Sequence, residues 1–300
     1  MPERRGRLVV VGTPIGNLED LSPRARRALE SADAIYCEDT RVTAKLAARF
    51  GLAAPRVASP EPRERQRAGE LLARLAAGET VAFVSDAGMP GISDPGRWLV
   101  AAAAEAGFPV EVVPGPSAPA AALAVSGLSG VPHLFLGFLP AREGERRRAL
   151  EALRERPETL LWFEAPHRIA ASLEDAARLL GPRRAALSRE LTKAHEEILR
   201  GTLVEIARRM RERGTARGEI TVVCEGASPE AAPALSGSDL DGEIRARLAQ
   251  GVEKRRISRE LARRAGLPAR EIYARAVALD AVSRPPDGGR KASRREPRRR

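Results

Sequence analysis

The stretch SDAGMPGISDPG, Ser85–Gly96, directly follows the apolar run TVAFV of Thr80–Val84. It holds three glycines, two prolines and two aspartates within twelve residues. Glycine admits backbone conformations that other residues avoid, whereas proline restricts them. In open α/β sheets, ligands bind in the loops at the carboxyl ends of the strands. A loop of this composition after a strand-like run therefore predicts a ligand site built on an α/β sheet.

Apolar runs of strand length alternate with helix-like segments along the rest of the first 225 residues, and this alternation predicts an α/β fold with largely parallel sheets. The clearest helix start is at Ser22, which we expect to be an N-cap before Pro23. The same pattern predicts that Asp94 caps the next helix and that Pro95 is its first residue. The other strand candidates are RLVVVG (7–12), DAIYCED (33–39), PVEVVPG (109–115), HLFLGF (133–138), TLLWFEA (159–165), RAALSRE (184–190) and GEITVVCEG (218–226).

The chain is long enough for more than one domain. A break near residue 117 separates two α/β regions, 1–117 and 118–226, each with four predicted strands. A linker rich in small residues and proline follows. Residues 238–281 then read as three helices, broken at Gly251 and at the Gly266-Leu267-Pro268 turn, which resemble a helix-turn-helix unit. The final segment, 282–300, is predicted to be a disordered basic tail.

Composition limits the possible classes of protein. A hydrophobic fraction of 43% suits a globular protein, and no apolar run is long enough for a membrane span. The N-terminus does not resemble a signal peptide, so we expect a cytoplasmic protein. Cys37 and Cys224 lie in strand-like runs without metal-ligand spacing, and we expect buried free thiols.

The chain carries a formal net charge of +11, and its last 18 residues contribute +6 of this, with eight basic residues against two acidic ones. Such a tail can bind phosphates by releasing counterions, or it can act only as a solubilising segment. The arginine-rich helices before it can equally contact nucleic acid or form a solvated face.

Most of the predicted strands end in an unusual loop, and together these loops describe a cleft. The chain lacks a G-x-x-x-x-G-K-[ST] phosphate loop, a G-x-G-x-x-G dinucleotide motif and a G-x-S-x-G nucleophile elbow. Its three histidines are not at metal-ligand spacing, so no metal site is predicted. The residues by themselves indicate a ligand-binding α/β enzyme, most simply a transferase.

The loops at the strand ends belong to eight stretches: GTPIGNLEDLSPRA, EDTRVT, SDAGMPGISDPG, PGPSA, GFLP, EAPHR, RELTKAHEE and RGEI. In these stretches, which run in family order, the chain closely resembles the ribosomal RNA small subunit methyltransferase I family of tetrapyrrole-methylase-like enzymes. The family usually has threonine at the position of Met89 and leucine at that of Gly91. The resemblance implies a two-domain fold with a cleft and S-adenosylmethionine-dependent 2′-O-methylation of a cytidine in the decoding region of 16S rRNA. It also implies a homodimer that acts on the small ribosomal subunit.

The resemblance further implies that S-adenosylmethionine lies folded between the two α/β regions. Asp86 would accept hydrogen bonds from its amino or hydroxyl groups, and the glycines would allow close backbone approach. The residues implied for cofactor binding are Asp86, Ala87, Gly88, Pro90, Gly91, Ile92, Ser117, Ala118, Glu219 and Ile220.

A hydroxyl nucleophile benefits from a group that accepts its proton. The catalytic candidates are Glu38, Asp39, Glu164, Glu190 and Lys193, with His167 as a further polar candidate. Each has a structural alternative: Asp39 can cap the helix that begins at Thr40, Glu38 can pair with Arg41, Glu190 can pair with Lys193, and His167 can cap a helix.

Contacts to RNA are assigned to Arg41, His167, Arg168 and Arg189, and Lys193 is a further candidate for a phosphate contact. Aromatic residues make up only 3% of the chain, so base stacking is expected to add little to RNA affinity. Two other functions remain open: a methyltransferase for tetrapyrroles or other small molecules, and a non-catalytic RNA-binding factor for ribosome assembly.

Overall fold

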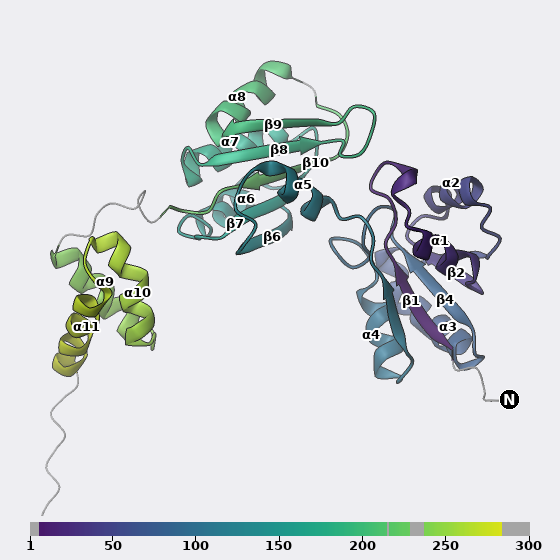
Figure 1. Cartoon of the computed structure of the whole chain (residues 1–300), viewed down its shortest axis with the longest axis horizontal. Coiled ribbons are helices and arrows are strands. Elements are labelled where there is room, and N and C mark those ends of the chain that lie inside the picture. The colour runs from purple at the N-terminus through teal and green to yellow at the C-terminus, as the bar shows by residue number, and fades with distance from the viewer. Residues whose placement is uncertain (1–5, 215, 229–236, 284–300) are drawn as a thin grey trace, which may run out of the picture. The chain divides into compact units, whose positions relative to one another are not determined.

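The computed structural model describes residues 6–214, 216–228 and 237–283. The chain forms two compact units, residues 1–226 and 227–300. The first unit contains two five-stranded sheets, and the second contains helices (Figure 1). None of the helices in the described ranges is long and apolar enough to cross a membrane.

The first sheet is entirely parallel, with strand order β3-β2-β4-β1-β5. Its carboxyl ends therefore all lie along one edge, as the sequence pattern predicts. The strand β3 is short and was not expected from the sequence. The strands are β1 (Arg7–Val11), β2 (Ala34–Cys37), β3 (Arg56–Ala58), β4 (Thr80–Val84) and β5 (Val110–Val113).

Alternation along the strands gives this sheet two apolar faces. Val9 and Val11 pack with α1 (Pro23–Glu30) and α2 (Thr40–Phe50). Leu8 belongs to the core formed with α3 (Glu64–Ala76) and α4 (Arg97–Glu105) on the other face. Because side chains of a strand alternate between faces, a continuous apolar run is buried on both sides. A short 3-10 helix precedes α1, Leu18–Asp20, and another precedes α3, Glu61–Arg63.

The starts of two helices test the capping predictions. Ser22 caps α1 by accepting a hydrogen bond from the amide of Ala25, and Pro23 is the first residue of the helix, as predicted. The prediction for Asp94 and Pro95 was wrong, because α4 begins at Arg97 with Gly96 at its N-cap. The carboxylate of Glu64 accepts hydrogen bonds from the amides of Trp98 and Leu99, at 2.8 and 3.0 Å. A side chain of α3 therefore caps α4, and Asp94 is free for another role.

The second sheet is mixed, with strand order β6-β7-β10-β8-β9, and here the expectation of largely parallel strands was wrong. Only β6 and β7 are parallel; β10 runs antiparallel to both neighbours, as β8 does to β9. The β8–β9 connection is a short turn, which can join only antiparallel strands. Strand β9 was also not expected. The strands are β6 (His133–Phe138), β7 (Thr159–Glu164), β8 (Arg184–Arg189), β9 (Glu197–Thr202) and β10 (Ile220–Cys224).

Helices cover both faces of the second sheet. The helices α6 (Glu143–Glu151), α7 (Ile169–Leu180) and α8 (Leu203–Arg213) share a large core with Trp162 on one face. On the opposite face α5 (Ala118–Ser126) packs on the sheet, with Ala122 buried against Leu161 and Val223. Cys37 and Cys224 are buried free thiols, as predicted.

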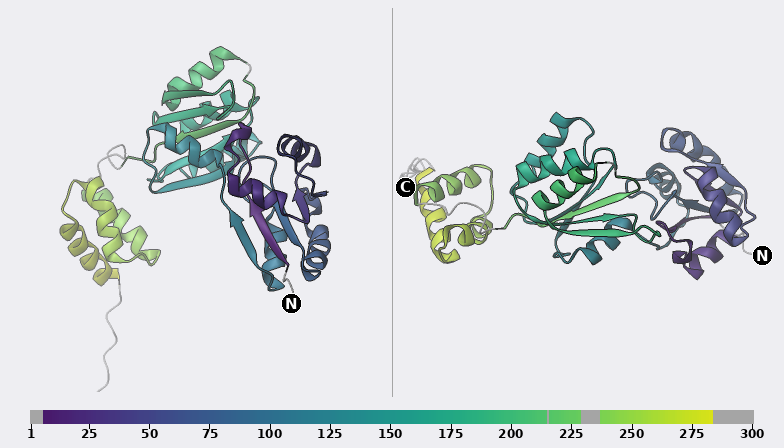
Figure 2. Two further views of the ribbon diagram at one scale, coloured as in Figure 1. Left: turned by 45° about the vertical axis from the view of Figure 1, so that its right-hand side comes forward. Right: turned by 90° about the horizontal axis from the view of Figure 1, so that it is seen from above.

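Within residues 237–283, the second unit forms three helices, α9 (Gly237–Ala249), α10 (Lys254–Ala265) and α11 (Ala269–Ser283) (Figure 2). Gly251 and Gly266, with φ of +75° and +63°, lie in the turns between them, as predicted. The three helices share a small apolar core. Most of the predicted basic tail, residues 284–300, lies outside the described residues.

Candidate active site

Loops at the carboxyl ends of strands from both sheets line one cavity of about 480 Å³ in the first unit. This volume lies in the range typical of small-molecule sites. The first sheet contributes the loops after β1, β2 and β4, and the second contributes the ends of β6 and β7 and the start of β10. The lining residues are Ile15, Glu38, Asp86–Met89, Ile92–Asp94, Ser117–Pro119, Phe138, Phe163–Pro166 and Gly218–Thr221.

The loops after β1 and β4 are fixed to each other by backbone hydrogen bonds. The amide of Thr13 donates to the carbonyl of Gly88 at 2.8 Å, and the amide of Gly88 donates to the carbonyl of Thr13 at 3.2 Å. The Thr13 hydroxyl also donates to the carbonyl of Ser85, at 3.3 Å. Gly88 has a φ of +77°, which favours glycine. This wall of the cavity is therefore held in shape before any ligand arrives.

A second close approach joins the loops after β1 and β5. A Cβ on Gly12 would lie 2.6 Å from the amide nitrogen of Gly115, so only glycine fits there. The same Cβ would lie 2.6 Å from the sulfur of Met89, and that sulfur is 3.3 Å from the Gly115 amide. Met89, which departs from the family pattern, thus fills the space behind the two glycines.

Most of the residues assigned to the cofactor line this cavity. Pro90 and Gly91 do not; they form the turn of the same loop, where Gly91 has a φ of +80° and its amide donates to the carbonyl of Pro95 at 2.9 Å. The assigned residues that line the cavity are Asp86, Ala87, Gly88, Ile92, Ser117, Ala118, Glu219 and Ile220.

Three of the carboxylates assigned to catalysis are held by cations. Asp39 caps α2 through the Arg41 amide and forms an ion pair with the Arg41 guanidinium at 2.6 Å, and these hydrogen bonds lower its pKa to about 2. Glu190 accepts hydrogen bonds from Lys193 and from the Glu219 amide, both at 2.9 Å, which lower its pKa. Glu164 is paired with Arg168. The structural alternatives for Asp39 and Glu190 are thus confirmed, and Arg41 pairs with Asp39 instead of Glu38.

The residues assigned to RNA are spread over the same edge of the sheets. Arg41 is exposed, whereas Arg168 is largely buried and donates to the carbonyl of Leu139 at 3.2 Å. Arg189 is paired with Glu197 at 3.1 Å. His167 is exposed and is not a helix cap, because Arg168 occupies the N-cap of α7.

Lys193 lines a second, smaller cavity of about 330 Å³ rather than the first. The two cavities share the wall formed by Ile15, Asp86, Ala87 and Glu219. Lys193 pairs with Glu219 at 3.3 Å, so this ion pair stands where the two cavities meet.

Glu38 and Asp94 are two carboxylates of the first cavity that are not neutralised by a cation among the described residues. Neither forms an ion pair within the described part of the chain, and the cavity lining contains no lysine or arginine. Burial, with repulsion from Asp86 and Asp94, raises the pKa of Glu38. Burial raises the pKa of Asp94 to about 6, and repulsion from Asp86 and Glu219 adds to this, while a hydrogen bond with Ser85 opposes it. The pKa of Asp86 is raised by burial too.

Comparison with known proteins decides the family. The family model of the tetrapyrrole (corrin/porphyrin) methylases matches residues 7–207. A ribosomal RNA small subunit methyltransferase I from Synechocystis is 43% identical over 277 residues, covering 92% of this chain and 99% of the relative. One from Mesorhizobium japonicum is 42% identical over 283 residues, covering 94% and 95%. This chain belongs to the ribosomal RNA small subunit methyltransferase I family.

Among solved structures, the methyltransferase CobJ matches with a TM-score of 0.58 at 22% identity, covering 74% of this chain and 95% of that one. This match shows that the two proteins share the tetrapyrrole methylase fold.

The cavity of this methyltransferase fits S-adenosylmethionine, the methyl donor of the family. The donor carries positive charge on its sulfonium and amino groups, and the cavity presents Glu38, Asp86 and Asp94 without a lysine or arginine. A phosphate-bearing ligand would find no cation in this lining. The tight glycine backbone at Gly12 and Gly88 lets main-chain groups reach the ligand, as a cofactor of this size requires.

Sequence reasoning missed Asp94 as a cavity residue of the methyltransferase because Asp-Pro is a common helix start. The signal that argues otherwise is Glu64, whose carboxylate takes the capping position on α4 from a distant part of the chain. Phe163, which also lines the cavity, was read only as a strand residue, and Phe138 of GFLP was given no role in the site.

Proposed function

We propose that this protein methylates the ribose 2′-hydroxyl of a cytidine in the decoding region of 16S rRNA. The chain is a S-adenosylmethionine-dependent methyltransferase of the ribosomal RNA small subunit methyltransferase I family, and rRNA is its substrate. The observation that carries the proposal is the cavity between the strand ends, whose lining has no cation and five carboxylates: Glu38, Asp86, Asp94, Glu164 and Glu219. It suits a cationic methyl donor.

The reaction is an in-line displacement in which the new O–CH₃ bond forms as the S–CH₃ bond breaks. When bound, the donor would supply the methyl group, and its sulfur would keep the bonding electron pair as a neutral thioether. Positioning two reactants in this way can supply roughly 7–11 kcal/mol of the rate acceleration. The braced loops of Thr13 and Gly88 provide a preformed wall for that purpose.

The binding of the donor is assigned to both sheets. Asp86 lies at the carboxyl end of β4 and would accept hydrogen bonds from the donor's amino or hydroxyl groups. Ala87, Gly88 and Ile92 extend this wall, with Ser117 and Ala118 beside it and Glu219 and Ile220 from the second sheet. Pro90 and Gly91 shape the loop without lining the cavity.

We propose that the carboxylate of Asp94 accepts the proton of the ribose hydroxyl. It lines the cavity without a cationic partner, and a pKa of about 6 leaves it ionised, yet able to take up a proton, near neutral pH. Glu38 is the second candidate, but its carboxylate also accepts a hydrogen bond from the Asp86 backbone. Hydrogen bonds from Arg41 and Lys193 lower the pKa of Asp39 and of Glu190, respectively, and so disfavour proton uptake. Glu164 is already engaged in its ion pair with Arg168.

RNA contacts are proposed for the exposed cations along the strand ends. Arg41 and His167 are exposed, and Lys193 reaches the second cavity. Arg168 and Arg189 are held by Glu164 and Glu197, so their direct contact with phosphate would require these pairs to open. Residues 284–300, which lie outside the described residues, add a basic tail that can bind phosphates by counterion release.

We propose that the enzyme works in the cytoplasm, on the assembled small ribosomal subunit and as a homodimer. The exposed edge strand β5 supports self-association, because Val110 and Val112 are 38% and 57% exposed on it. Light scattering measures the oligomeric state, and a monomeric mass at micromolar concentration contradicts the dimer.

The methylation assay tests the main proposal. The protein is incubated with S-adenosylmethionine and 30S subunits that lack the modification, and the nucleosides are analysed by mass spectrometry. We expect 2′-O-methylcytidine at one position. Its absence, where a control enzyme produces it, contradicts the proposal. Labelling of a porphyrinoid but not of RNA favours a tetrapyrrole methyltransferase, and failure of S-adenosylmethionine to raise the Tm favours a non-catalytic factor.

A further inference from the structure

Two large apolar side chains, Ile92 and Phe138, stand exposed at the cavity. Ile92 is 42% exposed and Phe138 is 57% exposed, and both line the cavity. Among the described residues, nine large hydrophobic side chains are exposed, and only these two line the cavity. The others are Leu18, Val110, Val112, Val131, Val204, Tyr273 and Val277.

Backbone geometry brings these two side chains to the same part of the cavity, although they come from different sheets. Gly137 precedes Phe138, and a Cβ on it would lie 3.0 Å from the hydroxyl of Ser93, which follows Ile92. Gly137 has a φ of +65° and Ser93 a φ of +61°, so both backbones turn sharply at the contact. The register between β6 and β7 also shifts between Phe135 and Phe138.

The ring of Phe138 is supported from one side by two other phenylalanines. The centroids of Phe138 and Phe163 are 5.4 Å apart with the ring planes inclined at 55°. Phe163 in turn meets Phe135 edge to face, with centroids 5.0 Å apart. Aromatic contacts of this kind favour a fixed ring orientation. Phe138 therefore offers a supported aromatic surface at the cavity that Ile92 also lines.

A flat aromatic ligand would bury both surfaces at once. Burial of an aliphatic or aromatic side chain that is exposed to water is favourable. Every nucleobase has an aromatic face that can stack on phenylalanine, whichever base it is. The polar part of the cavity, with Glu38, Asp86 and Asp94, remains available for the methyl donor. A base held between Ile92 and Phe138 would leave its ribose next to those carboxylates.

We propose that Ile92 and Phe138 form a clamp for the base of the target cytidine, which is extruded from the RNA before methyl transfer. This inference rests on the proposed rRNA methylation, because it assigns a subsite to that substrate. It also changes the expectation from composition: aromatic residues are only 3% of the chain, but two of them, Phe138 and Phe163, line this one cavity.

The adenine of the methyl donor is the other nucleobase that could fill the clamp, and the experiment separates the two. Phe138→Ala and Ile92→Ala are each compared with Val204→Ala, which removes an exposed side chain that lies on α8 and lines neither cavity. The measurements are kcat/KM with undermethylated 30S subunits and the Kd of S-adenosylmethionine by calorimetry. We expect kcat/KM to fall at least tenfold for Phe138→Ala, less for Ile92→Ala and not for Val204→Ala. The Kd of S-adenosylmethionine should change less than twofold for Phe138→Ala, whereas Ile92→Ala should weaken it, because Ile92 also belongs to the wall assigned to the donor. Phe138→Trp should restore most of the loss, because it keeps an aromatic face.

A fluorescent probe gives a second reading. Once mass spectrometry has located the modified cytidine, pyrrolocytidine replaces it in 16S rRNA that is then reconstituted into 30S subunits. Its emission should rise when wild-type protein extrudes the base, and the rise should be lost with Phe138→Ala. Equal rates and equal emission for Phe138→Ala and wild type overturn the clamp. A tenfold weaker Kd for S-adenosylmethionine in Phe138→Ala also overturns it, because Phe138 would then hold adenine. If wild-type protein leaves the RNA unmethylated, the proposed function itself fails.

Discussion

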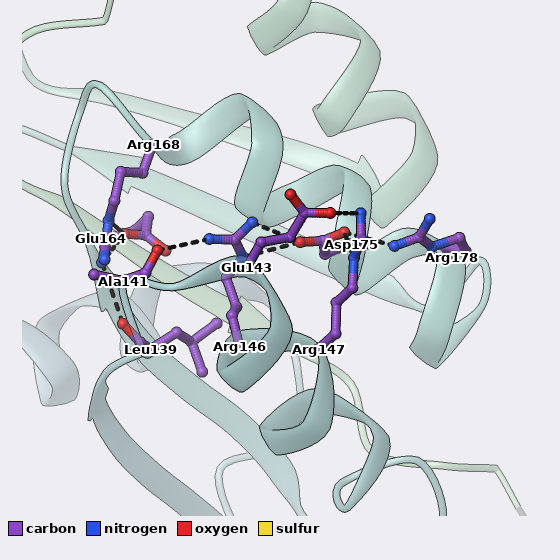
Figure 3. A network of polar contacts seen from close by, with 9 residues as sticks. All are labelled: Leu139, Ala141, Glu143, Arg146, Arg147, Glu164, Arg168, Asp175 and Arg178. Atoms are coloured by element: carbon purple, nitrogen blue, oxygen red, sulfur yellow. Dashed lines mark hydrogen bonds and ion pairs between the residues drawn. The ribbon is translucent and has the colours of Figure 1, made fainter.

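Asp94 and Asp175 are both partly or fully buried aspartates in the first unit, and their surroundings are opposite. Asp175, on α7, is 5% exposed and contacts the guanidinium groups of Arg146, Arg147 and Arg178, at 2.6, 2.8 and 2.8 Å (Figure 3). Asp94 faces Asp86, Glu219 and the Ser85 hydroxyl. Burial alone would raise the pKa of Asp175, but hydrogen bonds from Arg147 and Arg146 outweigh it and lower that pKa. The pKa of Asp94 is raised.

The difference separates a structural carboxylate from a functional one. Asp175 ties α7 to α6, and Arg146 continues the network to the carbonyl of Ala141 at 3.3 Å. A charge neutralised by three cations stabilises the fold but cannot easily take a proton. Asp94 lacks that neutralisation, and perturbed carboxylates in a cavity are frequently functional. The two residues should therefore respond oppositely to the same kind of substitution.

The largest effect is expected from Asp175→Ala, on stability. Removing one partner of a buried ion pair leaves an uncompensated charge, here on Arg146, whose side chain is 6% exposed. We expect the free energy of unfolding to fall by about 3–5 kcal/mol. Chemical denaturation measures it. Glu174→Ala, next along the helix and 39% exposed in its pair with Arg211, is the matched control and should cost less than about 1 kcal/mol.

The pKa of Asp175 also determines how its contribution to the free energy of unfolding depends on pH. Its folded pKa lies below the unfolded value, so its contribution is present above pH ~4 and disappears as the pH falls through the folded pKa. The stability difference between wild type and Asp175→Asn should therefore shrink in acid. A difference that stays constant down to pH 2 contradicts the role of its charge.

The next largest effect is expected from Asp94→Asn, on catalysis. An asparagine keeps the shape but cannot accept the proton, and loss of a general base typically costs about 10²-fold in kcat. The wild-type rate should fall on the acidic side with an apparent pKa of about 6, and this limb should be absent in the variant. Rates are measured from pH 5 to pH 9 at saturating S-adenosylmethionine.

Two further variants test whether the loss of activity in Asp94→Asn is specific to Asp94. Glu105→Gln, on the exposed side of α4, should leave the rate and its pH profile unchanged. Glu38→Gln tests the other cavity carboxylate, and if it alone removes the acidic limb, the proton acceptor is Glu38. A loss of S-adenosylmethionine binding in Asp94→Asn, with kcat preserved at saturation, would assign Asp94 to the cofactor instead.

The smallest effect is expected from Asp94→Asn on stability, and it has the opposite sign to that of Asp175. Because the folded pKa is raised, the stabilising contribution of Asp94 is present below pH ~4 and is lost as the pH rises through about 6. At pH 8 the variant should be more stable than wild type by about 1 kcal/mol, because solvent screening reduces the full effect of such a shift. At pH 4 the two should match. Thermal unfolding at both values measures it, and a less stable variant at pH 8 contradicts the account.

The sequence predicted the fold class because hydrophobic periodicity is a local property. Alternation of strand-length runs with helical segments held for all eight of the predicted strands, and the two turns between α9, α10 and α11 contain the predicted glycines, Gly251 and Gly266. The mixed order of the second sheet did not follow from the same pattern, because strand direction depends on which strands pair. β9 is half exposed along its length and has no continuous apolar run.

Two helix starts show where sequence reasoning about the site stops. Ser22-Pro23 and Asp94-Pro95 carry the same local signal, and only the first caps a helix. The second fails because Glu64 occupies the capping position, a contact across 34 positions that no local pattern contains. Likewise, the resemblance to the family supplied most of the cavity lining, but only the tertiary structure separates the carboxylates held by cations from those that are not.

The paired amides of Thr13 and Gly88 belong to no strand, yet they join the loops after β1 and β4 as a strand pair would. Both residues are buried, at the ends of two adjacent strands in the middle of the sheet. Their hydrogens can exchange with solvent only when these loops separate, which would open the sheet at its carboxyl end. In deuterium exchange the amides of Thr13 and Gly88 should therefore be among the slow ones, although both residues lie outside the strands. The wall that receives the methyl donor should then open only as often as the sheet opens at its carboxyl end.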